Sequence, residues 1–237
     1  VRYKTYLEYL HAELGPDGNF RLLSNGEVVK LPPEDEENTF VADEFAEFLR
    51  RLSTNRRLVK SSSIEIQVHP VGDNRVNREP DLIVLRPEHL TLMTELKKGA
   101  ILFGAPPPLL IAEMVSPGGE GSDKCRRDYE WKREQYEWWQ IPEYWIIDRH
   151  RAQVVICTLK DEAYTEQRYT GSDIITSSGF LTLKIAVDKL LSGDILQASA
   201  IILWPAHSAY ILTIKMRLPQ PYSAMASQLR VHSPPIS

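Results

Sequence analysis

Two continuous apolar runs in the middle of the chain each carry one carboxylate. Asp81 opens the run Leu82–Leu85, and Glu113 lies inside the run Leu109–Val115. Uninterrupted apolar runs of this length are typical of strands that are buried in a sheet. A carboxylate in such a strand is costly to bury without a partner, so Glu113 needs either a partner or a place on an exposed strand face.

Local patterns elsewhere predict a mixture of helices and strands. Helical spacing of apolar residues predicts helices over Thr5–Leu14, Asn38–Leu52, Glu88–Leu96 and Asp123–Trp139. Short apolar or alternating runs predict strands over Phe20–Leu23, Glu27–Leu31, Leu58–Lys60, Ile64–Val68, Tyr144–Asp148, Val154–Leu159 and Ala163–Tyr169. Leu183–Leu191 is predicted to be a strand or a short helix, and Val71–Glu79 and Gly99–Pro108 are predicted to be loops. Because no β-α-β rhythm is sustained, we expect an α+β or mixed α/β fold.

The C-terminal segment, residues 195–237, differs in composition from the rest of the chain. It has no acidic residue, and its only charged side chains are Lys215, Arg217 and Arg230. We therefore expect one domain over residues 1–194 and a compositionally foreign extension over residues 195–237. The longest apolar run of the chain, Ala198–Ile214, is broken by Pro205 and is too interrupted to span a bilayer, so we expect no membrane partner.

Overall charge and cysteine content narrow the classes of function. The formal net charge is -4 at pH 7, so charge alone does not indicate a nucleic-acid binder. The two cysteines, Cys125 and Cys157, cannot form a disulfide framework and lack metal-binding spacing. Val1–Tyr9 does not resemble a secretory signal, and we expect a cytoplasmic protein.

Asp81, Glu113 and Lys132 are the strongest candidates for a chemical site. Two carboxylates on neighbouring strands suit a hard divalent cation such as Mg²⁺, which prefers oxygen ligands. Such a cation can polarise a phosphoryl oxygen and activate water, while a nearby ammonium group stabilises developing negative charge. Simpler interpretations stay open at this point. Asp81 can be a turn or capping residue, Glu113 can lie on an exposed face, and Lys132 can be the helix partner of Asp128.

A series of motifs in this order resembles one known family. The motifs are Pro80-Asp81 with its apolar strand, Leu109–Pro117 around Glu113, the spaced trio Asp128, Lys132 and Tyr136, the segment Ile141–Asp148, and the N-terminal segments Phe20–Val29 and Leu31–Glu34. The sequence resembles the Uma family of putative restriction endonucleases, which is abundant in cyanobacteria and belongs to the PD-(D/E)XK nuclease superfamily. The resemblance runs from about Thr5 to Leu191 and leaves out the C-terminal extension.

The resemblance implies a restriction-endonuclease-like core, with a central mixed sheet flanked by helices. It implies Mg²⁺, or Mn²⁺, held by Asp81 and Glu113, with the carbonyl of Met114 as a further ligand. The superfamily pattern has a lysine two residues after the acidic residue, where this chain has Val115. We expect Lys132 to supply that charge.

Two further residues, Asp128 and Tyr136, are expected to support the site. The family's N-terminal Tyr-Glu-Leu-Ile reads Phe20-Arg21-Leu22-Leu23 here, so one supporting carboxylate is replaced by Arg21.

The sequence thus favours a Mg²⁺-dependent endonuclease that hydrolyses DNA phosphodiester bonds. Lys124, Arg126 and Arg127 lie between Glu113 and Lys132 and are candidate contacts to nucleic acid, although a solvated loop would have the same composition. The alternative is a catalytically degenerate nuclease fold that binds DNA or protein. A third class is a structural or oligomeric protein in which these charges form an internal ion-pair network. DNA is the expected partner, and a homodimer is compatible with the sequence.

Overall fold

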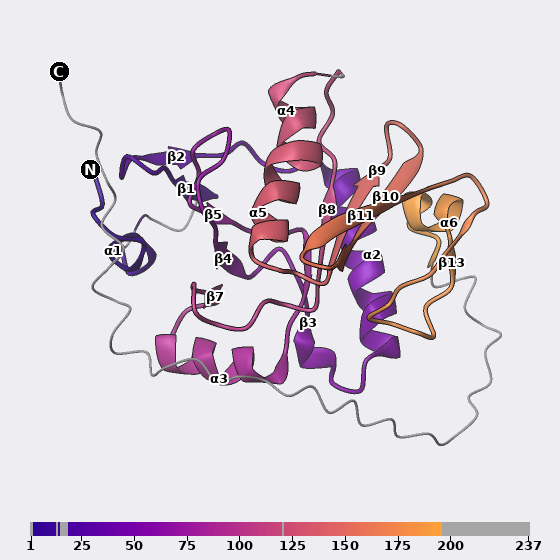
Figure 1. Cartoon of the computed structure of the whole chain (residues 1–237), viewed down its shortest axis with the longest axis horizontal. Helices are drawn as coiled ribbons and strands as arrows, with labels where there is room; N and C mark the ends of the chain where they lie inside the picture. The colour runs from indigo at the N-terminus through magenta and orange to yellow at the C-terminus, as the bar shows by residue number, and fades with distance from the viewer. Residues whose placement is uncertain (1, 13, 15–18, 120, 196–237) are drawn as a thin grey trace.

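A central six-stranded sheet organises the molecule (Figure 1). The computed structural model describes residues 2–12, 14, 19–119 and 121–195. Across the sheet the strands run in the order β11 (Ala163–Thr170), β10 (Gln153–Lys160), β9 (Glu143–Asp148), β8 (Leu110–Met114), β6 (Leu82–Val84) and β3 (Val59–Ser61). Strands β8 and β9 pair in parallel and the other neighbours pair antiparallel, which confirms the predicted mixed sheet.

Helices cover both faces of this sheet. Helix α2 (Glu36–Leu52) packs Phe45 and Leu49 onto one face, where they join the alternate strand residues Leu82 and Ala112. On α2, Asp35 caps the first turn by accepting a hydrogen bond from the backbone N–H of Asn38. Every residue of β6 and β8 is buried, on both faces of the sheet. This agrees with the uninterrupted apolar sequence of the two strands.

The opposite face is covered by one long helical segment. It consists of α4 (Asp123–Arg126), a π-helical turn (Arg127–Trp131) and α5 (Lys132–Trp138). The sequence predicted one long helix over Asp123–Trp139. The structure differs from this prediction by the π-helical turn in the middle of the segment. Tyr136 and Trp139 pack against the second set of alternate strand residues, which includes Ile83 and Ile111.

Several smaller elements come from the N-terminal half of the chain. The hairpin β1 (Phe20–Leu22) and β2 (Val28–Lys30) is confirmed, whereas α1 (Tyr6–Leu10) is shorter than predicted. A second small sheet pairs β4 (Glu65–Gln67) with β5 (Asn77–Arg78) and β7 (Ala100–Ile101). The last two strands lie in stretches predicted to be loops. That prediction was wrong because a two-residue strand is defined by a distant partner and leaves no local periodicity.

The remaining elements complete the domain. They are the 3₁₀ turn Arg56–Leu58, α3 (Pro87–Leu96), β12 (Ile174–Ile175), β13 (Ile185–Ala186) and α6 (Val187–Ser192). The segment that was predicted to be a strand or a helix therefore holds both. The predicted C-terminal extension lies outside the described residues except for its first, so the domain boundary stays a prediction. Among the described residues, no helix is long and apolar enough to cross a membrane.

Candidate active site

The register between β6 and β8 places the two carboxylates side by side. Leu82 pairs with Ala112 and Ile83 pairs with Ile111, so one further step along both strands sets Asp81 opposite Glu113. Side chains that face each other across an antiparallel pair have Cβ atoms about 4.5–5.5 Å apart. Asp81 Oδ2 also accepts a hydrogen bond of 2.6 Å from the backbone N–H of Met114. Both carboxylates therefore lie on the sheet face that α5 covers.

Helix α5 supplies the partners of Glu113. Tyr136 Oη donates to Glu113 Oε1 at 2.6 Å, and Lys132 Nζ lies 2.9 Å from Glu113 Oε2. Only 2% of Glu113 is exposed. This rules out the interpretation in which Glu113 occupies a solvated strand face, and it explains how a carboxylate is tolerated inside an apolar strand.

Lys132 joins two buried carboxylates rather than extending into solvent. Its Nζ lies 2.7 Å from Asp128 Oδ1, one helical turn earlier, as well as beside Glu113. Asp128 is fully buried and is also contacted by Arg127, with 3.3 Å between Nε and Oδ1. The helix pair expected from the spacing is thus present, and it forms part of a larger ionic cluster.

Electrostatics distinguish Asp81 from its neighbours. Burial, together with repulsion by Glu113, raises the pKa of Asp81 well above its usual range, and Lys132 only partly offsets this. Burial alone would raise the pKa of Asp128 too, but the attraction of Lys132 and Arg127 lowers it overall. The negative charge of Asp81 is therefore less compensated by the protein than that of Asp128.

A small pocket of ≈ 40 Å³ opens at this cluster. Its lining includes Asp81, Glu113, Met114, Lys132 and Arg127, together with Arg21, Glu34, Arg75, Arg78, Glu79, Leu31 and Ser116. The structure brings together the predicted trio and places Asp128 and Tyr136 directly behind it. Sequence reasoning did not single out Arg75 and Arg78, because they lie in a polar stretch without a motif of its own.

The three residues predicted to contact nucleic acid differ in their distance from the pocket. Arg127 lines the pocket, whereas Lys124 and Arg126 do not. Arg126 instead forms an exposed ion pair of 3.0 Å with Glu130, and its guanidinium lies 5.4 Å from the centre of the Trp131 ring. Of the three residues, only Arg127 is positioned beside the carboxylates.

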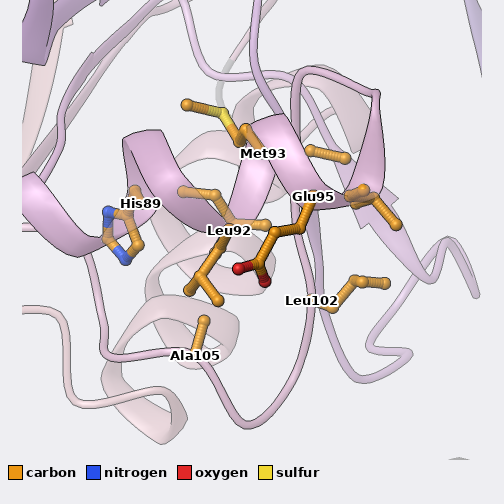
Figure 2. Close-up of a pocket in the computed structure, with 9 residues that line it drawn as sticks. His89, Leu92, Met93, Glu95, Leu102 and Ala105 are labelled. Carbon is orange, nitrogen blue, oxygen red and sulfur yellow. The ribbon is translucent and has the colours of Figure 1, made fainter.

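A larger pocket, ≈ 360 Å³ in volume, lies between α3 and the segment that contains β7 (Figure 2). Figure 2 shows His89 at one end and Leu102 at the other. Both ring nitrogens of His89 are used: Nδ1 accepts the N–H of Arg86 at 3.1 Å, and Nε2 lies 2.7 Å from the carbonyl oxygen of Pro106. Because the lining is mostly apolar and lacks paired reactive groups, we assign the chemistry to the smaller pocket.

Comparison with known proteins agrees with this geometry. The sequence model of Uma2, described as a putative restriction endonuclease family, matches residues 5–188. The chain belongs to the Uma2 family. A putative nuclease of the DUF820 group from Anabaena variabilis ATCC 29413 has a similar crystal structure, with a TM-score of 0.54 and 14% sequence identity. The alignment covers 75% of this chain and 92% of that chain, so the two share a fold. No curated protein matches the sequence.

Val115 and Lys132 lie on the same sheet face as Glu113. Val115, at the usual lysine position, packs in the apolar cluster beneath α5. Its side chain shares the strand face of Glu113, because alternate strand residues point the same way. Lys132 reaches that face from the helix above it, so the ammonium group arrives beside Glu113 from a different element.

The donor set fits a divalent cation with few protein ligands. Within the described residues, no group of three or more His, Cys, Asp and Glu side chains is arranged to hold a metal. Mg²⁺ commonly binds through one or two carboxylates and keeps several waters, so the pair Asp81 and Glu113 is sufficient. The raised pKa of Asp81 supports this fit, since a cation beside it would stabilise the ionised form.

Proposed function

We propose that this protein is a Mg²⁺-dependent endonuclease that hydrolyses phosphodiester bonds of DNA. The observation that carries the proposal is the pairing of Asp81 with Glu113 on one sheet face, with the ammonium group of Lys132 2.9 Å from Glu113. Family membership supports a nuclease, and arginines around the pocket suit a phosphate-bearing substrate.

Each side chain has a distinct part in this proposal. Asp81 and Glu113 hold Mg²⁺, or Mn²⁺, with the Met114 carbonyl as a further ligand. When bound, the cation polarises the phosphoryl oxygen and lowers the pKa of the attacking water. Lys132 stabilises negative charge that develops on the phosphate or orients that water.

Two positioning residues fix these groups. Tyr136 fixes Glu113 through a hydrogen bond of 2.6 Å, and Asp128 fixes Lys132 through an ion pair of 2.7 Å. Contacts of this kind orient the groups that bind a metal ion.

The direct test is conversion of supercoiled plasmid to nicked or linear DNA. Wild-type protein is expected to cut in Mg²⁺ or Mn²⁺ and to stop when EDTA is added. Asp81→Asn is expected to abolish cutting, whereas Asp188→Asn, which alters an exposed carboxylate on α6, is expected to cut normally. Cutting that persists in purified Asp81→Asn would refute this assignment.

A second candidate is a nuclease fold that binds DNA or protein without cutting. Two observations favour it: Arg21 stands where the family has a glutamate, and both oxygens of Glu113 already have partners within the protein. This candidate predicts binding of a labelled duplex with no metal-dependent product. The plasmid assay therefore separates the two functions.

We also propose a cytoplasmic location. It agrees with the free thiols of Cys125 and Cys157, which a reducing compartment preserves. Assembly as a homodimer stays a prediction, and sedimentation of the purified protein would test it.

A further inference from the structure

Four arginines line the pocket, and burial divides them into two pairs. Arg21 and Arg78 are 5% and 2% exposed. Arg78 makes a two-pronged contact with Asp73, at 2.9 and 3.0 Å, and donates to Gln135 at 2.9 Å. Arg21 donates to the backbone carbonyl of Phe20 and to Glu79. These two side chains are structural, because their guanidinium groups are committed to the protein.

Arg75 and Arg127 form the second pair and keep donors free. Their side chains are 17% and 20% exposed. Arg75 uses Nε to contact Asp73 at 3.1 Å, and Arg127 uses Nε and Nη2 to contact Asp128 and Ser116. In the described part of the chain, no guanidinium nitrogen is both buried and without a partner. The remaining Nη groups of both arginines therefore reach solvent.

The π turn explains how Arg127 comes to face the pocket. In a regular α-helix with about 3.6 residues per turn, residues five apart point roughly 140° away from each other. A π turn joins residues five apart by its hydrogen bonds, which brings them toward one side of the helix. Arg127 and Lys132 are five apart, and both line the pocket across this turn.

Arg75 is held against the same turn by close packing. Gly72, in the loop before Arg75, lies so close to Trp131 that an added Cβ would be 2.2 Å from the ring. Its φ of +57° also favours glycine. Trp131 is the last residue of the π turn that begins at Arg127. The loop that carries Arg75 is thus fixed on the element that carries Arg127.

The two guanidinium groups repel each other, and Arg75 is the less compensated of the two, since, despite burial, Asp128 raises the pKa of Arg127 above its ordinary value. Burial lowers the pKa of Arg75 to about 10; Asp73 opposes this, while Arg78 and Arg127 add to it. Asp73 is shared by Arg75 and Arg78, and Asp128 is shared by Arg127 and Lys132. An anion that accepts hydrogen bonds from the remaining Nη donors of both arginines would relieve this repulsion.

We propose that Arg75 and Arg127 together bind a backbone phosphate of DNA beside the carboxylate pair. This inference rests on the proposed function, since it names two substrate-binding residues of that site. Phosphodiester oxygens match the planar donor forks of arginine, and such contacts position a nucleic acid without reading its sequence.

The experiment measures binding of a fluorescein-labelled 30-base-pair duplex of mixed sequence by anisotropy, with Ca²⁺ in place of Mg²⁺. Arg75→Gln and Arg127→Gln are each expected to raise the Kd about tenfold. Each is also expected to lower the dependence of log Kd on log salt by about one. Arg168→Gln, which removes an exposed arginine on the edge strand β11, is the matched control and is expected to bind as wild type.

Both variants are designed to keep the fold. Without Arg75, Asp73 still pairs with Arg78, and without Arg127, Asp128 still pairs with Lys132. Melting curves of the two variants test whether the fold is kept. Arg75→Lys provides a second variant that retains the charge and loses the fork, and it is expected to bind with intermediate affinity.

The outcomes separate the inference from the proposed function. If wild-type protein binds and cuts DNA while both glutamine variants bind with unchanged Kd and salt dependence, the phosphate site is wrong and the endonuclease stands. If wild-type protein binds without cutting and both variants bind more weakly, the endonuclease is wrong and the phosphate site stands. If wild-type protein does not bind the duplex, both are wrong.

Discussion

Two buried carboxylates on adjacent strands have different surroundings. Glu113 on β8 is 2% exposed and Glu143 on β9 is 1% exposed. Glu143 pairs in register with Leu110, at the opposite end of β8 from the pocket, and shares the sheet face of Trp145, which α2 covers. The two acids thus lie on opposite faces and near opposite ends of one strand pair.

Their hydrogen-bond partners explain what each acid does. Glu143 accepts hydrogen bonds from the Trp145 indole, from Ser177 and Ser178, and from the backbone N–H groups of Ser178 and Gly179. All these donors are neutral and all belong to the protein, so the carboxylate fastens the segment 177–179 to the sheet. Glu113 instead lies beside a second carboxylate and an ammonium group at a pocket. Under the proposed function, an adjacent charged cluster at a pocket, rather than burial alone, distinguishes the metal-binding acid from the structural one.

The largest expected effect concerns Lys132. Lys132→Gln removes the only ammonium group among the described residues that line the pocket, and plasmid cutting is expected to fall by about 10²–10³-fold. Because Asp128 and Glu113 lose a buried partner, the free energy of unfolding is also expected to fall by about 3–5 kcal/mol. Cutting is measured below the melting temperature of the variant. Near-normal cutting by folded Lys132→Gln would remove Lys132 from the chemistry.

Glu143→Ala is expected to lower the stability of the protein without lowering its rate of DNA cutting. Five donors lose their acceptor, so the free energy of unfolding is expected to fall by about 2–4 kcal/mol. Urea denaturation measures this change. Cutting by the folded variant is expected to match wild type. A large loss of cutting without a loss of stability would mean that the two acids do not differ as described.

Tyr136→Phe tests the support of Glu113. Loss of the 2.6 Å hydrogen bond is expected to weaken Mn²⁺ binding about tenfold, as removal of an outer-shell contact to a metal ligand typically does. Titration calorimetry measures the affinity. Tyr164→Phe, which alters a buried tyrosine that donates to the Ile141 carbonyl and does not line the pocket, controls for loss of a buried hydroxyl. Equal affinities in wild type and Tyr136→Phe would make Tyr136 a packing residue.

A half-buried carboxylate, Glu65, provides the smallest effect. Burial raises its pKa above the ordinary value, although hydrogen bonding from Tyr6 opposes the shift. A raised folded-state pKa contributes stability below the unfolded-state pKa, and this stability is lost as pH rises through the folded-state value. The contribution of Glu65 to the free energy of unfolding is therefore expected to decline from about pH 4 upward, and Glu65→Gln should remove that contribution from the pH profile. An unchanged pH profile in Glu65→Gln would contradict this.

Elements with strong local signals were predictable from the sequence. Helix α2 and strands β6, β8 and β9 were predicted because periodicity and continuous apolar runs record burial directly. Strand β5 and the π turn were not, since both depend on distant packing partners. Asp81, Glu113 and Lys132 were identified by residue type and motif; the structure places them at one pocket, and their catalytic roles stay predictions.

The rest of the site lacked such a signal. Arg75 lines the pocket from a loop whose Gly72 packs on Trp131, a contact between segments nearly 60 residues apart that no local pattern encodes. The structural role of Glu143 was hidden for a similar reason, because its donors at residues 177–179 lie more than 30 residues away.

Metal binding tests the contrast between the two acids most directly. Titration calorimetry with Mn²⁺ compares wild type, Asp81→Asn, Glu113→Gln and Glu143→Gln at one pH and ionic strength. We expect wild type and Glu143→Gln to bind with the same affinity, and both Asp81→Asn and Glu113→Gln to bind more weakly by more than about a hundredfold, beyond typical outer-shell effects. Wild-type affinity in Asp81→Asn, or an equal loss in folded Glu143→Gln, would contradict a metal site at the carboxylate pair.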